Sequence, residues 1–342
     1  MGKTTVGIDG QKFYINNKPT YSGRVWRDYD IEGLLMNNRL VQATFDDENL
    51  QTRSMWAYPD TGTWDAERNV QEFVDALPRY RDCGVLGLTV NFQGGNPKGY
   101  GWPQPWENNA FTPEGNLRPA YVGRMKRVID VMDELGMVAI LGVFYFGQDE
   151  RLKDEQAVIR GLEHAIGWVL DQGYTNVLIE VNNECNVKKY EHEILMPARV
   201  HELIEMVKGM TKNGRRLLVS TSYGGRFVPL ENVVCASDFL LLHGNGVKEY
   251  TRIAEMVDQT RQVAGYRPMP ILFNEDDHYE FDQPMNNFVA AISRYASWGC
   301  LDIGQNNYVD GYQSPPVNWG LSTERKRGFH ALAKEITGYG AA

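Results

Sequence analysis

Short apolar runs rich in β-branched residues alternate along this chain with segments that have helical spacing. Runs of this kind are typical of buried parallel strands. They predict strands at residues 39–47, 84–91, 137–144, 177–182, 216–222, 238–243, 270–275 and 299–303. Apolar residues spaced three and four apart predict helices at 67–83, 119–135, 154–171, 197–211, 249–263, 286–298 and 323–336, with a weak helical segment at 230–235. Pro78 is expected to bend or restart the first helix.

Strands that alternate with helices imply a parallel sheet with right-handed crossovers, and eight such units favour a closed (β/α)8 TIM barrel. A Rossmann fold is disfavoured because no GxGxxG motif follows the first strand. We expect one catalytic domain over residues 1–342, with residues 1–35 as an N-terminal hairpin and lead-in. Asn16 and Asn17 suit the tight turn of that hairpin, which is placed to plug the bottom of the barrel.

Composition narrows the classes of partner. The chain has 342 residues and a net charge of −9, which argues against nucleic acid or an anionic membrane and suits a neutral substrate. Its four cysteines show no CxxC spacing, so neither a zinc site nor a disulfide framework is indicated. No apolar stretch of about 18 residues and no signal-like N-terminus is found. The expected location is the cytoplasm, or outside it with a signal peptide already removed, and the oligomeric state stays open.

Two glutamates carry the strongest chemical signal. The run at 177–182 leads directly into Asn183 and Glu184, and the run at 270–275 ends in Asn274 and Glu275. The glutamates are 91 residues apart, or about three strand-helix units of roughly 30 residues each. Active sites of parallel barrels lie at the carboxyl ends of their strands. A single glutamate there is as easily a solvated loop residue or a helix cap, but two equivalent placements favour a catalytic pair.

On these residues the sequence resembles the clan A glycoside hydrolases, a cellulase-like superfamily of retaining (β/α)8 enzymes. Asn183 and Glu184 match the Asn-Glu pair on strand four that carries the acid/base, and Glu275 matches the nucleophile on strand seven. His243, after strand six, stands where members often hold a His or Tyr near the nucleophile. The chain departs from the family 5 pattern because Asn91 and Gln93, not an arginine, follow strand two. The resemblance therefore implies a mechanism and no particular substrate.

Several other residues are candidates for substrate binding, each with a plainer interpretation beside it. His243 can equally be a satisfied core histidine, and Tyr223 either orients one of the glutamates or packs at the rim. Asn183 and Asn91 are candidate hydrogen-bonding groups at strand ends. Aromatic rings stack on sugar faces, so the aromatic residues Trp102, Trp106, Tyr145 and Trp319 are grouped as candidates, although any one of them can be loop packing.

Other catalytic chemistries have weaker support. The segments Asp46-Asp47-Glu48 and Asp276-Asp277-His278 are metal-like in composition but lack EF-hand spacing. Residues 220–225 do not form a GxSxG elbow, and no base is evident beside Cys185. We therefore expect no metal and no cofactor.

The sequence thus predicts a retaining hydrolase of β-linked glycans or oligosaccharides, with Glu275 as nucleophile and Glu184 as acid/base. Two alternatives stay open: a carbohydrate-binding barrel without activity, and a metal-dependent barrel hydrolase. The loops at 46–65 and 92–118 are long and hold six tryptophan and tyrosine residues. High walls of this kind favour action near a chain end or on short oligosaccharides over cleavage within a long chain.

Overall fold

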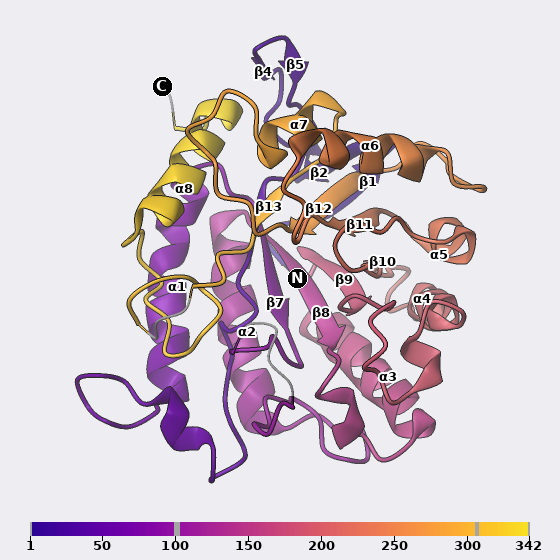
Figure 1. Cartoon of the computed structure of the whole chain (residues 1–342). Coiled ribbons are helices and arrows are strands. Elements are labelled where there is room, and N and C mark those ends of the chain that lie inside the picture. Colours follow the sequence, from indigo (N-terminus) through magenta and orange to yellow (C-terminus); the bar gives the residue numbers. More distant parts are fainter. Residues whose placement is uncertain (1, 99–102, 305–307, 341–342) are drawn as a thin grey trace.

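The computed structural model describes residues 2–98, 103–304 and 308–340. Within these ranges, eight parallel strands form the centre of the molecule and helices surround them (Figure 1). In chain order the strands are β6 (Asn37–Arg39), β7 (Gly87–Asn91), β8 (Val138–Phe144), β9 (Val177–Asn182), β10 (Leu218–Ser220), β11 (Leu240–His243), β12 (Ile271–Glu275) and β13 (Gly299–Cys300).

The strands close into a ring. Six of them form one sheet in the order β10-β9-β8-β7-β6-β13, and β11 pairs with β12. Isolated parallel bridges between Ser222 and Leu241 and between Leu272 and Ser297 join the pair to the larger sheet on both sides. The architecture is therefore the (β/α)8 barrel that the alternation of strands and helices predicted.

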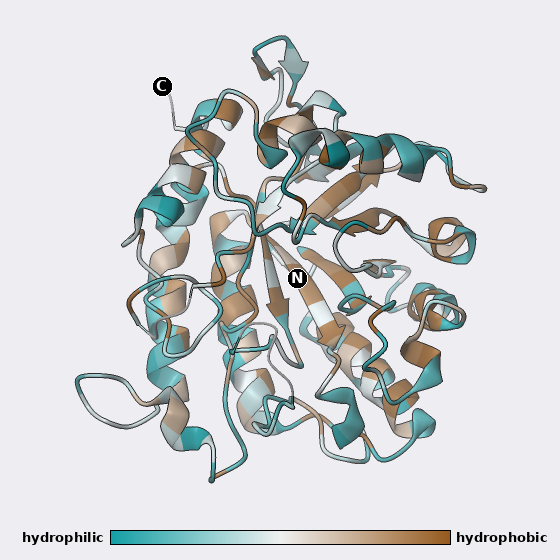
Figure 2. Ribbon diagram, in the orientation of Figure 1, coloured by the Kyte–Doolittle hydropathy of each residue, from teal (hydrophilic) through white to brown (hydrophobic). Residues whose placement is uncertain are grey.

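The helices are amphipathic and turn their apolar faces toward the strands (Figure 2). They are α1 (Ala66–Asp82), α2 (Pro119–Leu135), α3 (Glu155–Gln172), α4 (Val200–Gly209), α5 (Glu231–Ala236), α6 (Tyr250–Arg261), α7 (Asn287–Ser293) and α8 (Glu324–Thr337), with short 3-10 turns at Arg53–Trp56, Asp149–Arg151 and Glu193–Leu195. Local sequence sets their ends. The Asp65 side chain accepts hydrogen bonds from the first turn of α1, and Gly136, at φ 75°, ends α2 in the left-handed conformation. Among the described helices, none is both long and apolar enough to cross a bilayer.

The N-terminal segment covers the amino ends of the barrel strands. β1 (Val6–Asp9), β2 (Lys12–Ile15) and β3 (Lys18–Pro19) form an antiparallel sheet, with Asn16 and Asn17 in the turn at φ 52° and 63°. The ring of Phe13 meets that of Phe239, just before β11, at a centroid distance of 6.3 Å. The predicted hairpin is therefore present and lies at the bottom of the barrel. A second, separate hairpin is formed by β4 (Val25–Trp26) and β5 (Tyr29–Asp30).

Three predicted boundaries are wrong. The first barrel strand is Asn37–Arg39 and not residues 39–47, because its inward-facing residues are polar and an apolar pattern therefore does not reveal it. Helix α1 continues through Pro78 instead of restarting there, and α7 ends at Ser293, so residues 294–298 lead into β13.

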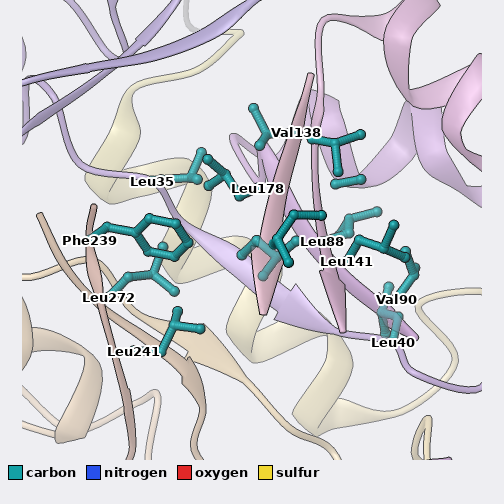
Figure 3. Close-up of a cluster of buried hydrophobic side chains, with 14 of the residues drawn as sticks. Leu35, Leu40, Leu88, Val90, Val138, Leu141, Leu178, Phe239, Leu241 and Leu272 are labelled. Carbon is teal, nitrogen blue, oxygen red and sulfur yellow. The ribbon is translucent and has the colours of Figure 1, made fainter. Parts of the chain in front are cut away.

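The barrel interior has two halves of different character. Side chains alternate along a strand, so Leu178 and Glu180 of β9 lie on the same face, as do Leu272 and Asn274 of β12. Near the amino ends of the strands, which we call the lower half, the inward residues are apolar (Figure 3); they include Leu35, Leu178, Phe239, Leu241 and Leu272. Near the carboxyl ends, which we call the upper half, they are polar; they include Asn37, Arg39, Thr89, Asn91, Glu180, His243 and Asn274.

Candidate active site

The two glutamates singled out from the sequence converge at the carboxyl ends of β9 and β12. Glu275 is the last residue of β12, and Glu184 follows the end of β9 by two residues. Glu184 has a φ of 49°, unusual for a residue with a side chain, and its N–H donates to Ser222 Oγ at 2.9 Å. One carboxylate oxygen of each glutamate and a ring nitrogen of His243 all lie within 4.8 Å of one another. Glu184 is 8% exposed and Glu275 is 6% exposed, so both residues are almost completely shielded from bulk water.

His243 lies between the two carboxylates. Its Nδ1 is 2.9 Å from Glu184 Oε1 and 3.6 Å from Glu275 Oε2, and the side chain is fully buried. Because Nδ1 faces carboxylate oxygens, which only accept when ionised, it is the protonated ring nitrogen. Burial by itself would lower the pKa of His243, but the charges of Glu275 and Glu184 outweigh burial and raise it above its ordinary value.

Arg39 lies under the same pair and is the main residue that sequence reasoning missed. It is almost wholly buried, forms an ion pair with Glu275, and donates to Asn183 Oδ1. Its Nη1 also lies 3.4 Å from Glu180 Oε2. Burial would lower the pKa of Arg39, but Glu275 and Glu180 raise it, so the guanidinium stays charged. The family 5 pattern has an arginine at the end of strand two, which this chain lacks. In this structure a buried arginine, Arg39, stands instead at the end of the first barrel strand, β6.

Two further residues complete the surroundings of the glutamates. Asn245, two residues beyond β11, donates from its side chain to Glu275 Oε1. Glu180 is buried in the middle of β9, below Glu184. A signal for Glu180 existed in the sequence, since a lone carboxylate inside an apolar strand needs a buried partner. Arg39 gave no such signal because the predicted strand began at this residue, whereas in the structure Arg39 is the last residue of β6.

The remaining candidates for substrate binding lie in different surroundings. Tyr145 lines the cavity beside the glutamates, and burial, followed by the charges of Glu275 and Glu184, raises its pKa. Asn183 is held by Arg39. Asn91 is fully buried in the upper half of the barrel interior, and Tyr223 is buried with its hydroxyl toward Cys185. Within the described residues the Tyr223 hydroxyl makes no hydrogen bond to Glu184 or Glu275, so the predicted role in orienting a glutamate gains no support.

The cavity above the glutamates has a volume of about 140 Å³. Its walls come from the loops after β7, β8, β9 and β13 and from the end of β12; they include Asn96, Tyr145, Phe146, Glu184, Val187, Lys189, Glu275, Leu301 and Gln313. Two aromatic rings, Tyr145 and Phe146, thus line the same cavity as Glu184 and Glu275.

Two of the predicted stacking residues are packed elsewhere. Trp106 is 2% exposed and lies edge-on to Trp56 in a separate small cluster. Trp319 is equally buried, stacks on Tyr312 and donates from Nε1 to Asn69. Neither residue lines the cavity, so the grouping of these aromatic residues as a sugar platform was wrong for both. Trp106 is buried in a small loop cluster with Trp56, and Trp319 is buried in the main core against Phe73 of α1. Trp102 lies outside the described residues.

The metal-like sequences are used for structural hydrogen bonds. Asp47 accepts from Trp56 and Thr52 side chains, and Asp276 accepts from Trp298 and Asn287. Glu184, His243 and Glu275 are themselves close enough to offer three ligand atoms to a cation. The buried guanidinium of Arg39 already pairs with Glu275 there, and its positive charge opposes a second cation. The donor set therefore does not fit a resident metal.

This chain is similar to known proteins in its three-dimensional structure and not in its sequence. No protein-family model matches the sequence, and no curated protein matches it. Solved structures do match in three dimensions, for example an endo-1,4-β-mannanase from Rhizomucor miehei (11% identity, TM-score 0.58), covering 99% of this chain and 100% of its own. A β-glucosidase from Thermotoga maritima in complex with castanospermine (9% identity, TM-score 0.57) covers 90% and 99%, respectively. A glycoside hydrolase family 5 protein from Bacteroides vulgatus (14% identity, TM-score 0.57) covers 96% and 69%.

At these identities the similarity concerns the course of the backbone and not individual side chains. It extends over nine-tenths or more of this chain in each of the three cases. The chain therefore has the (β/α)8 barrel fold shared by these glycoside hydrolases.

Proposed function

We propose that this protein is a retaining glycoside hydrolase that acts on β-linked glycosides. The observation that carries the proposal is the approach of Glu184 and Glu275, whose nearest-facing oxygens lie within 4.8 Å in a shielded cavity. Retaining enzymes hold their two carboxyl groups about 5–5.5 Å apart, whereas inverting enzymes need about 6.5–9.5 Å to admit a water. The approach of the oxygens supports the first class. The β-linkage rests on the resemblance to clan A.

The contacts of the two glutamates support different roles for them. Glu275 is paired with Arg39 and with the amide of Asn245, groups that stabilise a carboxylate and suit a nucleophile. Among the described residues, Glu184 forms no ion pair with an arginine or lysine, and it faces His243, which can exchange a proton with it. Glu275 then attacks the anomeric carbon while protonated Glu184 gives its proton to the leaving oxygen. In the second step Glu184 removes a proton from the water that releases the sugar.

The walls of the cavity favour a chain end or a short substrate. They come from the loops after β7, β8, β9 and β13, and long loops that rise over the catalytic face of a barrel suit a chain end better than the middle of a long chain. We therefore propose action near a chain end or on short oligosaccharides. A time course on a long β-glycan distinguishes the modes, because an early spread of mid-sized products means cleavage within the chain.

The direct test is a screen of aryl β-glycosides in which the anomer of the first product is read by NMR. Retention of the β-configuration supports the proposal, and inversion contradicts the double displacement. Glu275→Gln is expected to abolish turnover, whereas Glu255→Gln, an exposed carboxylate on α6, is the matched control. Loss of activity with a chelator would favour a metal-dependent hydrolase instead. Binding of oligosaccharides with no turnover of any substrate would favour a barrel that only binds sugar.

A further inference from the structure

A third carboxylate lies beneath the two catalytic glutamates and has no place in the mechanism so far. Glu180 sits on β9, is fully buried, and faces the upper half of the barrel interior. Its Oε2 lies 3.4 Å from Arg39 Nη1 and accepts from Asn274 Nδ2 at 3.3 Å. Its Oε1 has no hydrogen-bond partner in the described part of the chain. Burying a carboxylate with one unsatisfied oxygen is unfavourable, so a role beyond packing is indicated.

The unsatisfied oxygen of Glu180 faces His243 from the side opposite to Glu184. Oε1 of Glu180 is 4.0 Å from Nε2 of His243, and this nitrogen also lacks a hydrogen-bond partner among the described residues. The distance is too long for a hydrogen bond, but it is short enough for a strong charge interaction in a buried site. The imidazole therefore has Glu184 and Glu275 near Nδ1 and Glu180 near Nε2.

The charges of the buried cluster balance only if Glu180 is counted. With Arg39 and His243 positive and with Glu180 and Glu275 negative, the cluster is neutral while Glu184 holds a proton. Without Glu180 the same cluster would carry one net positive charge. An excess positive charge in a shielded site favours loss of a proton from its neighbours.

We infer that Glu180 is a positioning residue whose fixed negative charge offsets Arg39 and keeps the mobile proton of the site on the Glu184–His243 pair. The inference rests on the proposed hydrolase function for its kinetic consequences only. Arg39 is held against Glu275 from one side and against Glu180 from the other, so the same carboxylate also fixes the guanidinium under the nucleophile. Glu180 touches no substrate and acts through Arg39 and His243.

The titration of His243 gives the sign of the expected effect. Burial lowers its pKa, Glu275 and Glu184 raise it, and Arg39 lowers it. The groups that face the pair from the surrounding elements are Arg39 of β6, Tyr145 after β8, Glu180 of β9 and Glu275 of β12. Neutralising Glu180 removes a negative charge 4.0 Å from His243 Nε2, whereas the positive charge of Arg39 remains. The pKa of His243 is then expected to fall.

The first experiment is an NMR titration of the full chain labelled with ¹⁵N-histidine, which needs no turnover. The sequence has six histidines, so the His243→Asn variant identifies the signal of His243. In the wild-type protein we expect both ring nitrogens of His243 to be protonated at neutral pH. In Glu180→Gln the midpoint is expected to fall by about one to three pH units, and in Glu255→Gln it should not move. Glu180→Asp, which keeps the charge, should have a His243 midpoint close to that of the wild-type protein.

The second experiment is the pH profile of kcat/KM on an aryl glycoside with a poor leaving group. The alkaline limb, on which the site loses its mobile proton, should move to lower pH in Glu180→Gln by a similar amount. A purely structural role would lower kcat/KM at every pH and leave that limb in place.

The inference is overturned if the alkaline limb and the His243 midpoint both stay where they are in Glu180→Gln. If that variant does not fold, a neutral His243 in the wild-type protein at pH 7 overturns it by itself. A protein that hydrolyses no glycoside but shows the His243 shift would refute the proposed function and leave this inference standing.

Discussion

The lower and upper halves of the barrel interior are built by the same strands from different kinds of residue. In the lower half, Leu178 and Leu272 fill the space between the strands with apolar volume (Figure 3). Two positions later on the same strands, Glu180 and Asn274 carry polar groups into an equally buried region. Apolar packing stabilises the fold, whereas the buried polar groups lower that stability unless each is paired. On these strands, the apolar residues that stabilise the fold and the polar residues of the candidate site therefore lie in different parts of the barrel interior.

Two glycines of the barrel strands make room for the polar side chains of the upper half. A Cβ atom on Gly142 would lie 2.3 Å from Asn91 Oδ1, and one on Gly299 would lie 2.0 Å from Asn37 Oδ1. These glycines therefore leave the space that the neighbouring amide side chains fill. In the lower half, where branched apolar side chains interdigitate, Gly87 makes a smaller space of the same kind, because an added Cβ would lie 3.1 Å from Leu35 Cγ.

Removing the proposed nucleophile, Glu275 in the upper half, should have the largest effect. Glu275→Gln is expected to lower kcat by roughly 10⁴- to 10⁶-fold, by analogy with the removal of other nucleophiles. The amide cannot form the glycosyl-enzyme. Turnover of an aryl glycoside, with and without added azide, checks this, and thermal unfolding of the same variant provides the control. Near-normal activity would show that Glu275 is not the nucleophile.

Replacing the proposed acid should have a smaller and more selective effect. Glu184→Gln is expected to slow substrates with poor leaving groups by roughly 10²- to 10⁴-fold, the usual contribution of a general acid. Substrates with good leaving groups should be attacked almost normally, because they need little protonation. A series of aryl glycosides with leaving groups of different acidity measures this. Equal losses across the series would contradict the assigned role.

A change in the lower half should do the reverse. Leu178→Ala is expected to lower the free energy of unfolding by about 2–5 kcal/mol, because it leaves a cavity among fully buried side chains. Glycoside turnover by the remaining folded protein should keep its pH profile. Denaturant unfolding of this variant measures the loss of stability, and a pH–rate profile of the same sample shows whether the active site has changed. A displaced pH profile would mean that the two halves are coupled more tightly than their separate packing suggests.

The smallest change tests whether every polar group of the upper half is needed. Thr89 is fully buried and its Oγ1 has no hydrogen-bond partner among the described residues. Thr89→Val keeps the shape and removes the hydroxyl, so the free energy of unfolding should change by less than about 1 kcal/mol. Chemical denaturation measures this, with Leu178→Ala as the contrasting variant. A loss of several kcal/mol would show that the hydroxyl is satisfied and structurally important.

Much of the fold was predictable because it depends on local patterns. Alternating apolar runs and helical spacing gave the eight strand-helix units, and Asn16-Asn17 gave the N-terminal turn. Errors occurred where the inward face of a strand is polar, as in β6, and where loop aromatics form their own cores, as Trp106 does with Trp56. In both cases the position of a side chain depends on residues distant in sequence, which no local pattern contains.

The sequence by itself determined that Glu184 and Glu275 stand at the ends of strands of a parallel array, because apolar period and strand direction place them there. Only the tertiary structure decided how close they come, and that His243, Arg39 and Glu180 gather around them. The reason is that barrel closure brings β6, β9, β11 and β12 together from sites up to 236 residues apart, as the hydrogen bond from Asn37 to Phe273 illustrates. Charges on such distant strands influence one another only once water has been excluded from the space between them.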